Sequence, residues 1–214
     1  MNEITEIRRL RAPVPRPQSL AFDGKYLWMG SIETRSLYAL DPESWTVVYE
    51  APAPGFPWGI TVANGELRIL CGEGDEDDRF IRSYVQGRGF GGRIACPDNT
   101  GSQLGFDGKL VHVSQWYKKR ILAIDDSGAV LSAINVPHGI CGQVIVDGNF
   151  NLVTTDDEAG SDYWLTRVDP GTGRSEDLAH IPFHARALAF DGSHFWTNHR
   201  EEGQIVCFAS FSTI

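Results

Sequence analysis

Three of the six histidines are the side chains of this chain best suited to acid–base or metal chemistry. His138, His184 and His199 fall at predicted loop or strand ends in the second half of the sequence. Near neutral pH an imidazole acts as a base or a metal ligand, and a neighbouring carboxylate holds one tautomer in place. We therefore treat these histidines as candidate catalytic residues. The alternative is that three loop histidines come together without a role.

Two acidic loops supply the carboxylates that such a site would need. GEGDEDDR (72–79) contains Glu73, and TTDDEAGSD (154–162) contains Asp156. Neither loop matches the D-x-D-x-D-G calcium pattern, and Ca²⁺ needs about six to eight oxygen ligands. Glu73 and Asp156 are nevertheless the candidate metal ligands, and a divalent metal, Mg²⁺ or Ca²⁺, is the one cofactor that we consider. The alternative is that both acidic loops are solvated surface.

Charge and composition exclude several partners. The chain of 214 residues has a net charge of −9 and a pI near 5.1, whereas nucleic acids and anionic membranes need a basic face. It has no apolar run of about 18 residues or more, and its start has no signal-peptide pattern. The four cysteines lie far apart, which predicts free thiols and a cytoplasmic protein. The oligomeric state stays open.

A repeat predicts the elements that must position any site. Five segments each read as an apolar strand, an Asp-Gly or Asn-Gly turn, and a second apolar strand. Successive turns are 41, 43, 40 and 44 residues apart. The turns begin at Asp23, Asn64, Asp107, Asp147 and Asp191.

Two further strands follow each hairpin, and four strands in about 40 residues are typical of a propeller blade. We expect an all-β, five-bladed β-propeller that forms a single domain, residues 1–214. The predicted blades are 17–55, 56–99, 100–138, 139–183 and 184–214 with 3–12. The last repeat lacks a fourth strand, so residues 3–12 should pair with 204–211 and close the ring. Trp28, Trp196 and Phe22 are expected in the core between blades.

Aligning the repeats on their turns places two rings of residues at the mouth of the central funnel. Candidate substrate-binding residues come from the starts of the first strands and from the end of one second strand. They are Gln18, Trp58, Gln103, Gln115, Trp116, Gln143 and Arg186. The alternative for the glutamines is that buried amides in a channel bind only backbone or ordered water.

Two stretches carry a resemblance to known propellers. FPWGITVANGELRIL (56–70) and VPHGI (136–140) resemble the blades of the streptogramin B lyase and SMP-30/NHL group. This resemblance implies a propeller fold and, for the lyase, a histidine and a metal ion that open a lactone by elimination. Pro-Gln-Ser-Leu at 17–20 and the five blades resemble plant-type glutaminyl cyclases, in which Gln18 has a counterpart. The carboxylate expected on the following strand has none here, because Met29 and Gly30 occupy that stretch.

Two functions follow from these observations. The first is a propeller that binds a small molecule in its funnel, acting as a metal-assisted lyase or hydrolase. The alternative is a non-catalytic propeller that binds a ligand or a protein. A histidine and a carboxylate that converge in the funnel would favour the enzyme.

Overall fold

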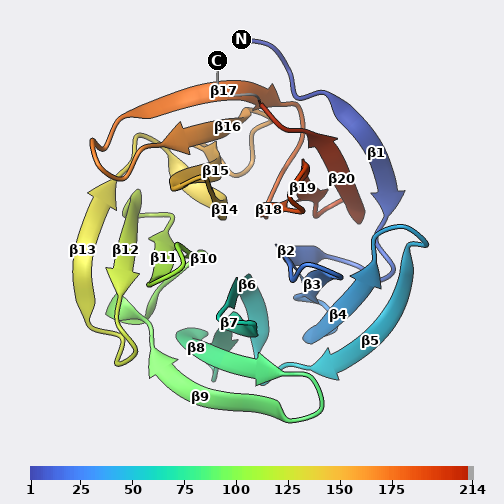
Figure 1. Ribbon diagram of the computed structural model, residues 1–214, viewed down its shortest axis with the longest axis vertical. Coiled ribbons are helices and arrows are strands. Elements are labelled where there is room, and N and C mark those ends of the chain that lie inside the picture. The colour runs from blue at the N-terminus through green and yellow to red at the C-terminus, as the bar shows by residue number, and fades with distance from the viewer. Residues whose placement is uncertain (212–214) are drawn as a thin grey trace.

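The computed structural model describes residues 1–211 and contains five four-stranded antiparallel sheets, arranged as a ring around a central channel (Figure 1). The first sheet contains β2 (Pro17–Phe22), β3 (Leu27–Ser31), β4 (Ser36–Asp41) and β5 (Thr46–Pro52). The second contains β6 (Phe56–Ala63), β7 (Glu66–Glu73), β8 (Asp78–Val85) and β9 (Gly89–Ala95). The third contains β10 (Gln103–Phe106), β11 (Val111–Gln115), β12 (Arg120–Ile124) and β13 (Val130–Asn135), and a short 3-10 helix, Pro97–Asn99, precedes it.

The last two sheets complete the ring. The fourth contains β14 (Gly139–Val146), β15 (Asn149–Thr155), β16 (Tyr163–Val168) and β17 (Ser175–Ile181). The fifth contains β18 (Ala189–Phe190), β19 (His194–His199), β20 (Gln204–Ala209) and β1 (Glu6–Arg11). The predicted five-bladed propeller is therefore confirmed. In each blade the first strand after the blade-to-blade connection, β2, β6, β10, β14 or β18, lies nearest the channel (Figure 1).

The predicted ring closure is also present. β1 pairs antiparallel with β20, with Arg9 opposite Val206 and Leu10 opposite Ile205. The pairing covers Glu6–Arg11 and Gln204–Ala209, so it is slightly shorter than predicted, and residues 212–214 lie outside the described residues. Ile4 is buried against the fourth and fifth blades, and its N–H donates to the carbonyl of His180. The N-terminal segment therefore joins these two blades.

The turns differ in length between blades. Asn64-Gly65 and Asp147-Gly148 are two-residue loops in which all four residues have positive φ, as a tight hairpin requires. In the other three blades four residues separate the last residue pair of the hairpin, and the aspartate that comes first among them accepts backbone N–H groups through Oδ1. The Oδ2 of the same aspartate accepts a hydrogen bond from the side-chain ring five residues later. This ring belongs to a tryptophan in the first and fifth blades and to a histidine in the third blade.

The core lies between neighbouring blades. Trp28 and Trp196 are buried there, as predicted. Phe22 is not, because the end of β2 reaches the channel, where its ring is half-buried. The innermost strands approach closely: a Cβ on Gly59 would lie 2.8 Å from the Cα of Gln103. A side chain at this position would therefore push β6 away from β10.

All four cysteines are free, as predicted, and all four are buried. Between Met1 and Phe211, helical structure is too short to cross a membrane.

Candidate functional site

The candidate site is a cavity of about 330 Å³ at one end of the central channel, which we call the funnel. Loops that precede the innermost strands and loops that follow the second strands line it, since both open at this end of the ring. The acidic loops 72–79 and 154–162 each contribute one lining residue, Arg79 and Glu158. The volume falls in the range of about 300–1,000 Å³ that small-molecule sites occupy.

In the first, second and fourth blades, a β-bulge at the start of the innermost strand places one residue in the funnel lining. The ladder skips one residue at Gln18, at Trp58 and at Cys141. An extra residue in one strand is left unpaired and bends the strand, which is how a bulge redirects a side chain. In the fifth blade Arg186 occupies the equivalent position, because it directly follows Ala185, which pairs with His199 in an isolated bridge. In the third blade Ser102 is equivalent. All five of these residues line the funnel.

The side chain of Gln103 forms the floor of the funnel. Its Nε2 donates to the carbonyl of Arg186 at 2.7 Å and to the carbonyl of Trp58 at 3.1 Å. These three residues belong to three different blades. The amide therefore spans the channel and divides the funnel from the channel's other end.

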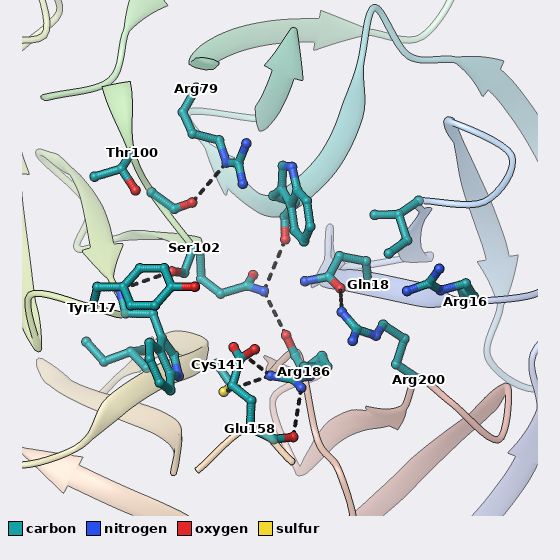
Figure 2. Close-up of a pocket in the computed structure, with 16 residues that line it drawn as sticks. Arg16, Gln18, Arg79, Thr100, Ser102, Tyr117, Cys141, Glu158, Arg186 and Arg200 are labelled. Carbon is teal, nitrogen blue, oxygen red and sulfur yellow. Dashed lines mark hydrogen bonds and ion pairs between the residues drawn. The ribbon is translucent and has the colours of Figure 1, made fainter. Parts of the chain in front are cut away.

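Arg186 is the most buried charged residue of the funnel lining. Its backbone N–H donates to Asn198 Oδ1 at 2.9 Å, and its side chain is 7% exposed. Figure 2 shows the guanidinium between the Cys141 thiol and Glu158; Nη1 lies 2.9 Å from a Glu158 carboxylate oxygen, and Nη2 donates to the Glu158 carbonyl. Burial alone would lower the pKa of Arg186, but nearby Cys141, Tyr163 and Glu158 raise it. The guanidinium therefore stays charged.

Three more arginines line the funnel. Arg79 lies over the Trp58 ring at 4.5 Å from its centroid and pairs with Asp77 at 2.6 Å. Arg200 donates to Gln18 Oε1 at 3.0 Å, as Figure 2 shows, and pairs with Glu201. Arg16 is exposed at the mouth. Among the described residues, Glu158 is the single acidic side chain in the lining.

Two buried donors in the funnel wall have no acceptor. Trp116 Nε1 and Arg186 Nε both lack a hydrogen-bond partner within residues 1–211. A buried donor without a partner costs roughly 1–3 kcal/mol, and an acceptor that reached either atom would remove that cost.

Most of the predicted substrate-binding residues lie in the funnel, and two do not. Those in the lining are Gln18, Trp58, Gln103, Trp116 and Arg186. Gln115 is buried outside it, where Nε2 donates to the carbonyls of Pro97 and Thr100 and Oε1 accepts from Arg120. It positions the loop before β10. Gln143 lies two residues past the bulge at Cys141, and it therefore lines the opposite end of the channel.

None of the three candidate histidines is among the described residues that line the funnel. His184 and His199 do come together, with ring centroids 5.9 Å apart. His199 also stacks on Phe183, and burial lowers its pKa. His138 lies elsewhere in the fourth blade, with Nδ1 2.8 Å from Asp156 Oδ2 and its ring against Trp164.

The two candidate metal ligands are held by cations. Glu73 accepts from Arg82 and Arg93, and although burial alone would raise its pKa, these bonds lower it. Asp156 is bound by Lys119 and His138, which lower its pKa. Within the described part of the chain, no three His, Cys, Asp or Glu side chains form a cluster that could hold a metal ion. This arrangement does not fit a shared metal site at Glu73 and Asp156.

The arginine cluster and the residues around it were not predicted from the sequence. These lining residues include Arg16, Arg79, Ser102, Cys141, Glu158 and Arg200. All lie in the blade-to-blade and second-to-third-strand connections or at their strand ends, which were expected at the funnel. Counting cations in those connections would have found the arginines.

Comparison with known proteins supports the fold. No protein-family model and no curated protein matches the chain. Among solved structures, glutaminyl cyclase from Myxococcus xanthus is similar with a TM-score of 0.70 and 16% identity, over 96% of this chain and 97% of that one. The PQQ-bound aldose sugar dehydrogenase from Streptomyces coelicolor gives a TM-score of 0.63 and 12% identity, over 99% and 82%. Hydrazine synthase from Kuenenia stuttgartiensis gives 0.55 and 17%, over 89% and 57%.

At these identities the similarity establishes the fold and not the activity. The three structures include a glutaminyl cyclase, in line with the weaker of the two resemblances in the sequence, and no streptogramin lyase. The chain is a five-bladed β-propeller of a kind that some enzymes also use.

Proposed function

We propose that the funnel binds a small organic anion that carries a carboxylate or phosphate group. The observation that carries this proposal is the cluster of Arg16, Arg79, Arg186 and Arg200 around one cavity. The cluster runs against the composition of the chain, whose net charge is −9. Guanidinium groups recognise carboxylate and phosphate oxygens through paired N–H donors.

The unpartnered donors support the same ligand. Arg186 Nε and Trp116 Nε1 are both in the funnel wall, and an anionic oxygen accepts from both kinds of group. Such charge-assisted bonds are about twice as strong as bonds between neutral groups.

Glu158 acts as an internal competitor in this proposal. Its carboxylate already binds Arg186, although its side chain is 49% exposed. A ligand anion would take over this guanidinium, so the buried Arg186 would keep an anionic partner while the half-exposed Glu158 side chain turned to solvent. Removing the Glu158 charge should therefore strengthen anion binding.

A catalytic role is the second candidate. It is supported by the fold shared with a glutaminyl cyclase and a sugar dehydrogenase. The nucleophilic and acidic groups beside Arg186 are poorly suited to it near neutral pH, since burial raises the pKa of Cys141 to about 11 and that of Tyr163 to about 12. A metal-assisted lyase or hydrolase would use His138, His184 or His199 with Glu73 or Asp156, none of which is among the described funnel residues. We therefore prefer binding to catalysis.

Calorimetric titration distinguishes a charged ligand from a neutral one. Succinate and inorganic phosphate should bind wild-type protein saturably, and succinamide should not. Arg200→Gln should weaken succinate binding about five- to tenfold, because it removes one accessible cation. Glu158→Gln should strengthen it. Arg174→Gln is the matched control: it removes the same charge from an exposed turn outside the funnel and should change nothing.

Equal effects of Arg200→Gln and Arg174→Gln would reject the funnel as the anion site. The catalytic candidate has its own test: a peptide with N-terminal glutamine is incubated with the protein, with and without Mg²⁺ or Ca²⁺, and ammonia is measured. Ammonia release above the rate without protein would favour catalysis over binding alone.

A further inference from the structure

A second cavity lies at the opposite end of the central channel, beyond Gln103. We call it the rear cavity. It has a volume of about 180 Å³, and residues of all five innermost strands line it. The residues that matter here are Phe22, Thr61, Phe106, Gln143, Ile145 and Phe190.

The rear cavity differs chemically from the funnel. Phe22, Phe106 and Phe190 each directly precede an Asp-Gly turn, and all three rings are half-buried. Together they form an aromatic collar. Among the described lining residues none is charged, and the polar side chains are Gln143 and Thr61. An ion would lose its hydration there without a partner charge, so this cavity selects a neutral occupant.

Gln143 has an unsatisfied acceptor in this uncharged wall. The residue is 3% exposed, and Nε2 donates to the carbonyl of His112 at 3.2 Å. An amide oxygen could not bond that carbonyl, so the amide orientation is determined and Oε1 is the remaining atom. Oε1 is buried and has no partner within residues 1–211.

The neighbouring strand is shaped to hold this amide. A Cβ on Gly105 would lie 2.6 Å from Gln143 Nε2, so β10 has room for the amide only with glycine at this position. The side chain is therefore held in place, and its free acceptor is preorganised for a donor from a ligand.

We propose that the rear cavity binds a neutral small molecule that has one apolar ring and a single O–H or N–H group, which donates to Gln143 Oε1. An apolar cavity of about 150 Å³ accommodates benzene, so a phenol-sized ring fits the volume found here. The collar contacts the ring, and the ligand hydroxyl satisfies the orphaned oxygen. This site is independent of the anion site in the funnel.

Phenol and toluene are matched probes, because they differ by a hydroxyl in place of a methyl group. Phenol should bind wild-type protein saturably in ligand-detected NMR titrations, about tenfold more tightly than toluene, since it supplies the missing hydrogen bond. Gln143→Leu keeps an apolar side chain of similar size but removes the acceptor, and it should abolish the preference for phenol. Gln18→Leu, in the funnel, is the control and should leave phenol binding unchanged.

Three results would overturn the proposal: no saturable binding of phenol, equal binding of phenol and toluene to wild type, or an unchanged phenol preference in Gln143→Leu. If Gln143→Leu does not fold, a measurement on the wild-type protein tests the proposal instead. The side-chain amide NMR signal of Gln143 should then shift at about tenfold lower concentrations of phenol than of toluene. A signal that moves with neither probe contradicts the site.

Discussion

Gln103 reaches across the central channel to Arg186, with Nε2 2.7 Å from the backbone carbonyl oxygen. This bond joins the third blade to the fifth at the floor of the funnel, and a second bond joins Trp58 of the second blade. The side chain is buried, so neither carbonyl receives a replacement donor when it is removed.

Gln103→Ala should therefore destabilise the protein by about 2–4 kcal/mol, because two buried carbonyls lose their donor. Urea unfolding followed by tryptophan fluorescence measures this change. Gln86→Ala is the control, since Gln86 is exposed in the loop between β8 and β9, and it should stay within about 0.5 kcal/mol of wild type. A loss no larger than that of the control would show that the bridge does not stabilise the ring.

Ring closure by β1 predicts the effect of a truncation. Deleting residues 3–12 removes the strand that pairs with β20 and leaves the edge of β20 unpaired, as well as removing buried Ile4 and Ala12. Exposed strand edges associate with other chains, so the truncated protein should be insoluble or unfolded. Circular dichroism and size-exclusion chromatography of the purified fragment test this. A monomer with the wild-type melting temperature would contradict closure.

The lowered pKa of His199 should make the folded protein less stable in mild acid. Burial lowers its pKa in the folded protein, and neighbouring His184 and Arg9 act in the same direction, against Glu201 and Glu202. In the unfolded chain a histidine takes up a proton near pH 6.5. The unfolded state therefore binds more protons below that pH, and the His199 contribution to stability is lost as the pH falls from about 6.5 towards the lower folded pKa.

The measurement is the melting temperature between pH 7.5 and 5, a range in which carboxylates with lowered pKa stay ionised. His199→Gln should reduce the fall in melting temperature across this range. If wild type and variant show the same pH dependence, the pKa of His199 is the same in the folded and the unfolded protein, which would contradict this prediction.

The four cysteine thiols should react slowly with a disulfide reagent while the protein is folded. Burial raises the pKa of Cys71 and Cys96 to about 12 and that of Cys141 and Cys207 to about 11. The thiolate is the reactive form, so a disulfide reagent at pH 8 should react with native protein slowly. In denaturant without reductant, four thiols should react at once. A count of two or none would mean that disulfides form.

The period of the Asp-Gly turns was sufficient to predict the blades and the closing strand, because the turn chemistry is local. The bulges were not predictable in the same way. The two-residue loops at Asn64 and Asp147 extend the strand pairing by one residue relative to the loop at Asp23, so the bulge lies six residues before these turns and five before Asp23. Counting back from the turn therefore does not locate the bulge: Gln143, four residues before Asp147, was assigned to the funnel, whereas Cys141 occupies that position.

The arginine cluster was missed for a different reason. Arg79 lies at the start of β8, and Arg186 and Arg200 lie in connections of the fifth blade, far from Arg79 in sequence. No motif records that these three residues line one cavity. For the histidines the predicted position in the chain was right, because His138, His184 and His199 all lie at the expected strand termini. Their side chains nevertheless do not line the funnel: His138 contacts Asp156, and His199 contacts Phe183 and His184. Blade consensus places the backbone, while side-chain direction depends on the local bulges.

The most direct test of anion binding is a crystal structure of the protein grown or soaked with succinate at a saturating concentration. The account predicts succinate in the funnel, with a carboxylate oxygen within about 3.2 Å of the Arg186 guanidinium and the Glu158 side chain turned away from Arg186. An empty funnel at that concentration, or succinate bound only on the outer surface with the Glu158–Arg186 pair intact, would contradict it.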